Sequence, residues 1–122
     1  ECLHEVFTIL KPGLFIYEIA KKIEMHADLH KCSVVRQFVG HGIGIRLHEP
    51  PQIPHSYNEI KISLVAGMTF AIEPMINAGS SSIVIDAEDK WTTRTVDKKP
   101  SAQWEHTFLI TEEGCEILTT FD

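Results

Sequence analysis

The sequence predicts one α+β domain, because helix-like spacing of apolar residues opens the chain and short β-prone segments fill the remainder. A chain of 122 residues can bury one real core but is too short for two ordinary domains, so the expected domain covers residues 1–122. The hydrophobic share of 43% and the charged share of 23% are those of a soluble globular protein. We therefore expect helices packed on antiparallel strands.

Two helices are predicted near the start of the chain. Residues 1–10 carry apolar side chains at the spacing of one helix face, and residues 16–28 repeat that spacing. Pro12 cannot continue a helical hydrogen-bond ladder and Gly13 permits the turn after it, so the two helices are separate. The apolar positions are Leu3, Val6, Phe7 and Leu10 in the first helix and Ile16, Ile19, Ala20 and Ile23 in the second.

The rest of the chain predicts short antiparallel strands. Residues 34–39 are rich in valine and phenylalanine and suggest the first of them. Three prolines between positions 49 and 54 exclude a helix and a central strand, so this segment is predicted to be an extended loop. Further β-prone runs, separated by turn residues, follow at 68–76, 82–85, 91–96, 105–111 and 116–119.

Charge, cysteine content and hydropathy disfavour several classes of protein. A net charge of −6 with scattered Lys and Arg disfavours a nucleic-acid binder, since phosphate contacts need clustered basic residues. Cys2, Cys32 and Cys115 are odd in number and widely spaced, which favours reduced thiols over a disulfide framework. No apolar run is long enough to span a membrane, and no secretory signal is recognisable. We expect a cytoplasmic protein without a nucleic-acid or membrane partner.

A glycine-rich segment at residues 40–50 places two histidines seven residues apart. Glycines around a histidine let backbone and ligand approach closely, so His41 and His48 could point into one cleft. A turn with two ordinary surface histidines explains the pattern equally well. A phosphate-binding loop fits poorly, because Ile45 stands where that loop needs glycine and no Gly-Lys-Ser/Thr ending follows.

Two carboxylates stand in segments that otherwise predict strands. Glu73 ends a strongly apolar run, where a buried carboxylate is costly without a cation or hydrogen-bond partners. A solvent-facing place at a strand end, next to Pro74, is the simpler alternative. In a strand, Glu105 shares a face with Gln103 and Thr107, which suits a site as well as a solvated surface.

His41, Glu73 and Glu105 together offer one imidazole and two carboxylates on separate strands. A hydrolytic pair of metal ions needs such donors, with a bridging carboxylate between the ions. This donor set suits Mn, Fe, Co or Zn better than Ca or Mg. These residues therefore indicate a candidate two-metal site.

The remaining histidines favour structural interpretations. His26 and His30 are one helical turn apart and near a cysteine, but they are explained equally well as surface residues of a helix, without a further evident ligand. His4 and His55 are predicted to face solvent. His106 is expected to pack beside the candidate site rather than to ligate.

Three segments together resemble signature blocks of the type I methionine aminopeptidases. The even spacing of His41, Glu73 and Glu105 leaves no room for the helical insertion of the type II enzymes, and further similarity extends over nearly the whole chain. The blocks are Gly40-His41-Gly42-Ile43-Gly44 with His48-Glu49-Pro50, Met68-Thr69-Phe70-Ala71-Ile72-Glu73-Pro74-Met75, and Ser101-Ala102-Gln103-Trp104-Glu105-His106-Thr107.

The resemblance implies a fold and a set of metal ligands. The chain would be the C-terminal half of a pita-bread domain, in which two similar α+β halves enclose a central metal site. Two divalent ions, Mn, Fe, Co or Zn, would bind there. His41 and Glu73 would ligate one ion, and Glu105 would bridge both.

The resemblance also implies a substrate, the N-terminal initiator methionine of nascent proteins, met on ribosome-associated chains. His48 would contact the peptide at the scissile bond and stabilise the oxyanion, while Glu73 would also shuttle a proton. Trp91 would wall the methionine pocket. Leu47 would border the same pocket, at a position where the family usually has an aromatic residue.

The family's other ligands, two aspartates, belong to an N-terminal half that has no counterpart in residues 1–122. We therefore expect the isolated chain to be inactive as a peptidase, although the intact protein is an enzyme. An Xaa-Pro-type aminopeptidase on the same fold is one alternative function. A non-catalytic pita-bread module that binds peptides or proteins is the other.

Overall fold

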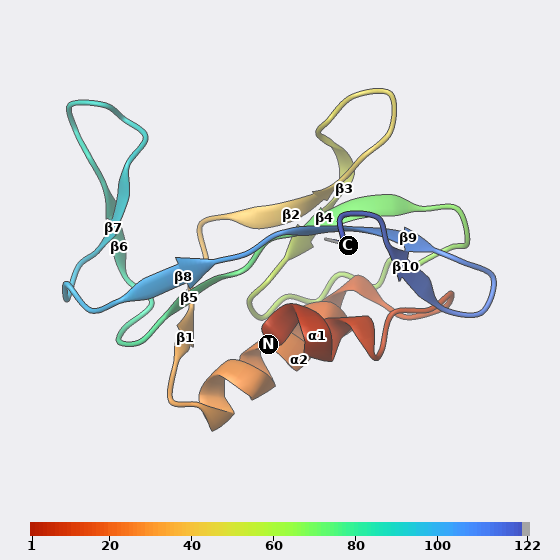
Figure 1. The fold of residues 1–122 in the computed structure, drawn as a ribbon, viewed down its shortest axis with the longest axis horizontal. Helices are drawn as coiled ribbons and strands as arrows, with labels where there is room; N and C mark the ends of the chain where they lie inside the picture. The colour runs from red at the N-terminus through yellow and green to blue at the C-terminus, as the bar shows by residue number, and fades with distance from the viewer. Residues whose placement is uncertain (121–122) are drawn as a thin grey trace.

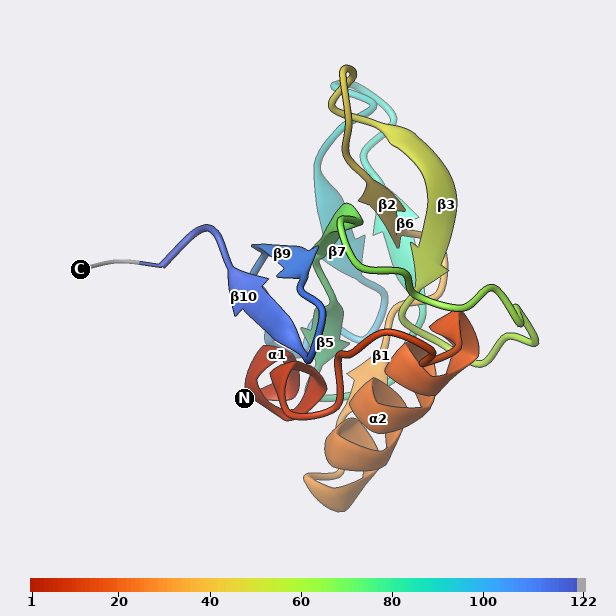
Figure 2. The ribbon, with the colours of Figure 1, turned by 90° about the vertical axis from the view of Figure 1, so that its right-hand side faces the viewer.

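The computed structural model describes residues 1–120 as two helices followed by short strands. The helices, α1 (Cys2–Phe7) and α2 (Ile16–Leu29), lie on one side of the strands (Figures 1 and 2). No helix in this part of the chain has the length and apolar character needed to cross a membrane. The strands are β1 (Ser33–Val34), β2 (Val39–Gly42), β3 (Glu49–Pro54), β4 (Thr69–Ile72), β5 (Met75–Asn77), β6 (Ile83–Ile85), β7 (Thr93–Thr95), β8 (Ser101–Gln103), β9 (His106–Ile110) and β10 (Cys115–Ile117).

Helix α2 forms where the spacing of apolar residues predicts it. Ile16, Ile19 and Ile23 are fully buried along one face, which packs toward the strands. At its start the carboxylate of Glu18 accepts a hydrogen bond from the amide of Phe15 at 2.8 Å, which satisfies a backbone donor that the helix leaves free.

Helix α1 is shorter than the predicted segment 1–10. It ends at Phe7, because the amide of Ile9 bonds to the carbonyl of Val6 at 3.0 Å in a tighter turn before the chain reaches Pro12. The apolar face nevertheless extends past the helix, since Leu10 is buried with Val6 in the core.

The strands form a five-stranded antiparallel sheet in the order β10-β9-β4-β2-β3 and a three-stranded sheet in the order β1-β5-β8. A separate hairpin joins β6 and β7. Phe70 on β4 and Phe108 on β9 are directly paired and fully buried, with ring centroids 6.3 Å apart. Burying such a side chain contributes about 1.5–3 kcal/mol, and both residues belong to the core that the sheet shares with the helices.

The chain passes between the five-stranded and the three-stranded sheet at two places, and the strand is interrupted at each of them. The predicted run 68–76 is interrupted at residues 73–74, which separate β4 from β5. On the returning chain, residues 104–105 separate β8 from β9. Because β4 pairs with β9 and β5 pairs with β8, the two interruptions lie side by side. Both segments therefore change from one sheet to the other at the same position along the paired strands.

The segment predicted as an extended loop is strand β3, so that prediction was wrong. It pairs with β2, with Val39 opposite Pro54 and His41 opposite Gln52, and the register shifts between His41 and Gly42. β3 is the outer strand of its sheet, where one row of backbone groups needs no partner strand. Prolines are excluded from a central strand but tolerated at such an edge.

Candidate metal centre

His41 lies in β2, in a stretch where the backbones are too close for side chains on the flanking residues. A Cβ on Gly40 would collide with the carbonyl oxygen of Ala71 on β4, and one on Gly42 with that of Pro50 on β3. The two glycines thus let β2 sit between its neighbours. The His41 side chain is 13% exposed.

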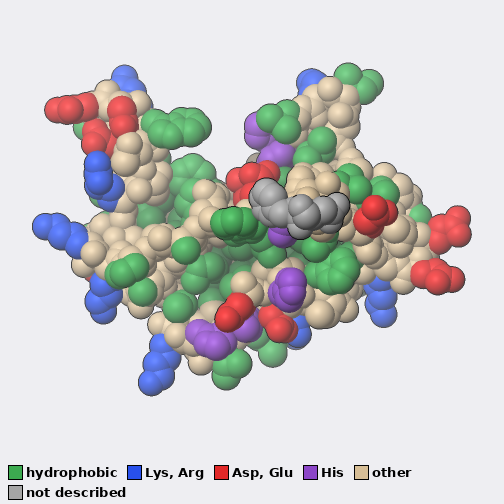
Figure 3. Space-filling model, viewed as in Figure 1, with side chains coloured by type: hydrophobic (Ala, Val, Ile, Leu, Met, Phe, Trp, Pro, Cys, Tyr) green, Lys and Arg blue, Asp and Glu red, His purple; other side chains and the backbone are tan. Residues whose placement is uncertain are grey.

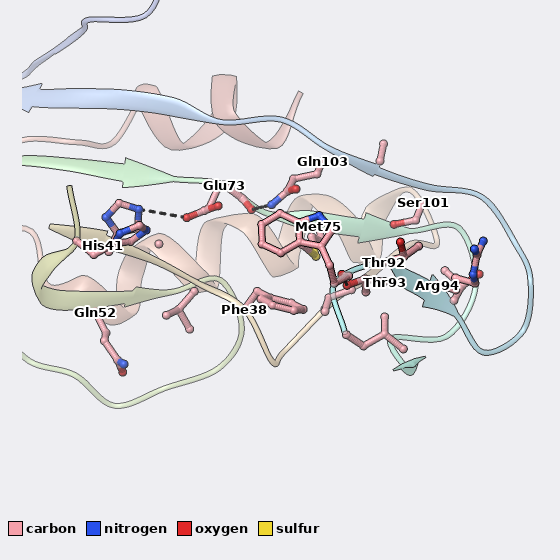
Figure 4. A pocket seen from close by; sticks show the side chains of 18 of the residues that line it. Phe38, His41, Gln52, Glu73, Met75, Thr92, Thr93, Arg94, Ser101 and Gln103 are labelled. Atoms are coloured by element: carbon pink, nitrogen blue, oxygen red, sulfur yellow. Dashed lines mark hydrogen bonds and ion pairs between the residues drawn. The ribbon is translucent and has the colours of Figure 1, made fainter. Parts of the chain in front are cut away.

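The orientation of the His41 ring leaves one nitrogen free for a ligand. Its Nδ1 lies 3.0 Å from the carbonyl oxygen of Gly42, and since a carbonyl only accepts, Nδ1 donates the proton. In the neutral ring, Nε2 is then an acceptor. It faces the Glu73 carboxylate at 3.5 Å (Figure 4). Metal-binding histidines commonly have their second nitrogen fixed in this way.

Glu73 lies in the break between β4 and β5, and its backbone is held from both sides. Its amide donates to Nε2 of His55 at 3.1 Å. Its carbonyl accepts from the side-chain amide of Gln103 at 3.1 Å, as Figure 4 shows. Pro74 ends the strand, so the carboxylate turns toward His41 rather than toward solvent. Its side chain is 22% exposed, which does not support the solvent-facing alternative.

Glu105 lies in the matching break between β8 and β9, not within a continuous strand. The expectation that it shares a strand face with Gln103 and Thr107 was therefore wrong, because the pairing stops at Gln103 and resumes at His106. The residue is exposed. The break still brings its carboxylate to the same place as the other donors.

His41, Glu73 and Glu105 each offer a ligand atom, and the three atoms lie within 4.8 Å of one another. One imidazole and two carboxylates fit a first-row divalent cation, and the anchored Nδ1 of His41 leaves Nε2 ready to bind it. The residues that the sequence places far apart thus converge. The candidate centre lies where the two sheets meet.

The electrostatics of the cluster also favour a cation. The pKa of Glu73 is raised, first by burial and then by the negative charge of Glu105, while His41 and His48 oppose the shift. Two carboxylates that repel each other in a partly buried place are stabilised when a positive charge lies between them.

The predicted substrate residues occupy different positions relative to this cluster. The His48 ring centroid lies 4.1 Å from that of His41, so His48 adjoins the centre, although it is exposed. His41, His48 and Glu73 line a cleft with a volume of about 1080 Å³. Trp91 is 85% exposed and lines this cleft too. Leu47 is 67% exposed and is not among the residues lining the cleft. Figure 4 shows the cleft reaching from His41 to Arg94 and Ser101.

His55 was predicted to face solvent, and this was wrong, since it is 1% exposed. Burial lowers its pKa to about 4, partly opposed by the Phe38 backbone, so the ring is neutral and can accept the Glu73 amide proton. A signal was present in the sequence. His55 stands two residues after Ile53, so in a strand the two share one face, and Ile53 is in the core.

His106 follows Glu105 in the chain, but its side chain lines a second cavity, next to Glu1 and His26, rather than the cleft of the metal centre. Its Nδ1 pairs with the hydroxyl of Thr119 at 2.8 Å, and its ring meets that of Phe108 edge-on with centroids 6.3 Å apart. It is not one of the three clustered donors. His4 is exposed, as expected.

Comparison with known proteins identifies the family. The sequence profile of metallopeptidase family M24 matches residues 1–112. The chain belongs to this family. Membership implies use of a divalent metal ion, in agreement with the donor set formed by His41, Glu73 and Glu105.

Curated relatives are named methionine aminopeptidases. The one from Chlamydia pneumoniae is 55% identical over 119 residues, which cover 98% of this chain and 41% of the relative. The one from Escherichia coli K12 is 45% identical over 120 residues, covering 98% of this chain and 45% of the relative. The chain therefore spans less than half the length of these relatives.

Solved structures agree with the fold. Methionine aminopeptidases from Rickettsia prowazekii and Thermotoga maritima each match with a TM-score of 0.92, at 39% and 41% identity, over 98% of this chain and 48% of theirs. A prolidase from Pyrococcus horikoshii matches with a TM-score of 0.69 at 21% identity, over 99% of this chain and 29% of its own, and shares the fold alone. The predicted α+β, pita-bread type of fold is confirmed.

Proposed function

We propose that the protein containing this chain is a methionine aminopeptidase, a metal-dependent hydrolase that removes the initiator methionine from nascent proteins. The observation that supports it most is the convergence of His41, Glu73 and Glu105 within 4.8 Å, in a chain 55% identical to a curated methionine aminopeptidase. Residues 1–122 would form the C-terminal half of its catalytic domain. The proposed substrates are ribosome-associated nascent chains in the cytoplasm.

Two divalent ions, Mn, Fe, Co or Zn, are the proposed cofactors. His41 and Glu73 would hold one ion, and Glu105 would bridge both. When bound, such a pair supplies a water molecule whose pKa is lowered toward neutrality. The 3.5 Å separation of His41 Nε2 and Glu73 Oε1 supports this assignment, because two donors to one ion are spaced by about 3 Å or slightly more.

Two side chains of this chain, Glu73 and His48, are proposed to act directly on the reacting groups. Glu73 accepts the proton of the attacking water and returns it to the leaving amine, a role that suits a carboxylate whose pKa burial raises. His48, beside His41, donates a hydrogen bond to the oxygen of the scissile carbonyl as negative charge develops there. Glu73 and His48 line the same cleft, so substrate and water would meet within reach of both.

The methionine side chain is proposed to bind beside this cluster. Trp91 lines the cleft and offers a large apolar surface to it. Leu47 would close the pocket on the other side when peptide is bound. Residues 1–122 supply three of the expected ligands, so the chain alone is proposed to be inactive.

The test is release of methionine from a Met-Ala peptide. The chain is assayed by itself and joined to the N-terminal part of the Chlamydia pneumoniae relative, each with Mn²⁺ or Co²⁺. We expect turnover from the joined protein only. Cleavage of Xaa-Pro peptides in preference to Met-Ala would overturn the assigned specificity, and full activity of the isolated chain would overturn its incompleteness.

The non-catalytic alternative predicts a different result. A binding module would retain peptide affinity without any metal-dependent hydrolysis in the joined protein. The matched control is the joined protein carrying Glu105→Gln, which removes one donor charge with little change in shape. Equal rates for the control and the unmodified protein would exclude the proposed metal mechanism.

A further inference from the structure

A second group of metal-competent side chains lies where the start of α1 meets the end of α2. His26 and His30, one turn apart on α2, have ring centroids 4.6 Å apart. Both direct Nε2 at the same carboxylate oxygen of Glu1, immediately before α1, at 3.2 Å and 3.8 Å respectively. In Figure 3, histidine and acidic side chains gather on the face formed by the helices. The sequence alone offered the two histidines and the nearby Cys32, but not Glu1.

The spacing of these three atoms matches what one cation requires. A zinc ion binds imidazole nitrogen and carboxylate oxygen at about 2.0–2.2 Å in tetrahedral geometry, which places any two donors roughly 3.3 Å apart. All three donor atoms lie within 4.8 Å of one another, so a small rotation of the exposed His30 and Glu1 side chains completes the arrangement. His26, 16% exposed, provides the fixed member.

The surroundings leave room for the fourth ligand that such a site needs. A cavity of about 500 Å³ opens over the cluster, and a water molecule could enter it. Cys32 also lines this cavity, but its thiol is directed to the carbonyl of His30 at 3.5 Å. The second cysteine in the cavity, Cys2, is not one of the clustered donors.

We propose that Glu1, His26 and His30 form a separate site for a first-row divalent cation such as Zn²⁺, which clamps α1 to α2. It shares no ligand with the centre at His41, Glu73 and Glu105. Two imidazoles and one carboxylate are suitable ligands for such a cation, and two histidines four residues apart on a helix present both rings on one face. The side chains of His30 and Glu1 are 53% and 79% exposed, so the ion exchanges with solvent and the site responds to metal supply.

The experiment measures binding of Zn²⁺ alone by competition with a chromophoric zinc indicator. The intact protein carries His41→Gln and Glu105→Gln throughout, so that the central cluster does not contribute. We expect one equivalent of Zn²⁺ in this background and at least tenfold weaker binding after His26→Gln with His30→Gln. His4→Gln is the matched control, because His4 is exposed and lines the same cavity without joining the cluster.

Unchanged affinity in the double variant, or equal losses in the double variant and the His4 control, would overturn the proposal. A second measurement does not depend on the folding of any variant. In the unmodified protein, the imidazole C–H resonances of His26 and His30 should shift as Zn²⁺ is added, and resonances that stay in place at saturation would contradict the site. Neither measurement depends on peptidase activity, so the outcome is independent of the proposed function.

Discussion

Histidine side chains in this protein differ in burial, and burial decides what each ring can do. His55 is buried in the core and stays neutral, so it accepts a backbone hydrogen bond and holds Glu73 in place. His41 is largely shielded but keeps one nitrogen directed at a carboxylate. His48 is exposed beside it and is free to meet a substrate. Three identical side chains thus occupy three environments, which suit the support of Glu73, the proposed ligation and the proposed catalysis respectively.

The Glu105 carboxylate gives a first prediction at this scale. In the intact protein, Glu105→Ala should abolish detectable turnover and prevent binding of the metal pair, because a bridging carboxylate serves both ions. Metal content is measured by elemental analysis after dialysis, alongside release of methionine from Met-Ala. Retention of both ions in the variant would show that Glu105 is not the bridging ligand.

His48 gives a contrasting prediction. His48→Ala should lower kcat by roughly two to three orders of magnitude, the range seen when one oxyanion donor is removed. Metal content should stay nearly unchanged, since His48 is not among the clustered donors. The two variants together separate ligation from catalysis, and a large metal loss in His48→Ala would contradict its assignment.

His55 predicts a pH dependence of stability. Its pKa is about 4 in the folded chain and 6.5 when unperturbed, so the unfolded chain binds the extra proton between these values. The stabilising contribution is full above about pH 6.5 and is lost as pH falls toward 4. Between about pH 7 and about pH 5 the free energy of unfolding should fall by roughly 2 kcal/mol from this group.

Urea unfolding at the two pH values checks this expectation against His55→Gln, which cannot titrate but retains a hydrogen-bond acceptor. The pH-dependent loss should be smaller in the variant by about that amount. His4→Gln serves as a control, because His4 is exposed. An identical pH dependence in all three proteins would mean that His55 is not buried as the structure describes.

At the scale of elements, the close approach of β2 to its neighbours is what positions His41. A methyl group on Gly40 would meet the backbone of β4 and, on its other side, that of β3. Backbone atoms of paired strands cannot move aside without breaking ladder hydrogen bonds. The glycines are therefore part of the site although they carry no reactive group.

Gly40→Ala should lower the free energy of unfolding by about 1–3 kcal/mol or more, the usual cost of overpacking. Metal affinity should fall as well, because β2 carries His41. Thermal unfolding and metal titration test the two effects. Gly114→Ala is the control, since a Cβ there meets no atom within 4 Å, and equal destabilisation of both variants would argue against the steric explanation.

The elements could be predicted from the sequence where periodicity or β-propensity is strong. Helix α2 and the strands near 83–85 and 93–95 fall where the pattern places them. The edge strand β3 could not be predicted, because whether a strand is central or outermost depends on which partners it finds. The breaks at 73–74 and 104–105 were missed for a related reason, since they reflect a change of sheet rather than a change of local preference.

The convergence of the three candidate ligands was predicted, but the residues that hold them in place were not. His41, Glu73 and Glu105 were expected to converge, and they do. The roles of His55 and Gln103 as partners of the Glu73 backbone were missed, since hydrogen bonds between distant segments leave no spacing signal. Glu105 was expected to share a strand face with Gln103 and Thr107, because side chains alternate along a continuous strand. This rule does not hold across the interruption at residues 104–105.

At the scale of the whole molecule, several large apolar side chains remain on the surface around the cleft. Ile45, Leu47 and Trp91 are at least two-thirds exposed. The hairpin of β6 and β7 and the loop between β2 and β3 rise from the sheets on either side (Figures 1 and 3). Exposed apolar surface of this kind often marks a place where another part of a protein binds.

If a further part of the catalytic domain covers this surface and adds ligands, metal affinity should depend on it. The chain alone should bind Mn²⁺ at least tenfold more weakly than the protein joined to the N-terminal part of a relative. Both are measured by competition titration and carry His30→Gln, so that the helical site does not contribute. Equal affinities would show that residues 1–122 contain the complete set of ligands.

The two breaks in the ribbon, lying at one level, have a mechanical consequence. Ladder hydrogen bonds between the paired strands are interrupted at the same level in both segments, so this joint between the two sheets is held by side-chain bonds to the Glu73 backbone unless something else also spans it. An ion shared by Glu73 and Glu105 would span it, one carboxylate from each interruption. Loading the metal would then stiffen the hinge between β4-β9 and β5-β8, and slower amide exchange in the short strands would accompany occupancy.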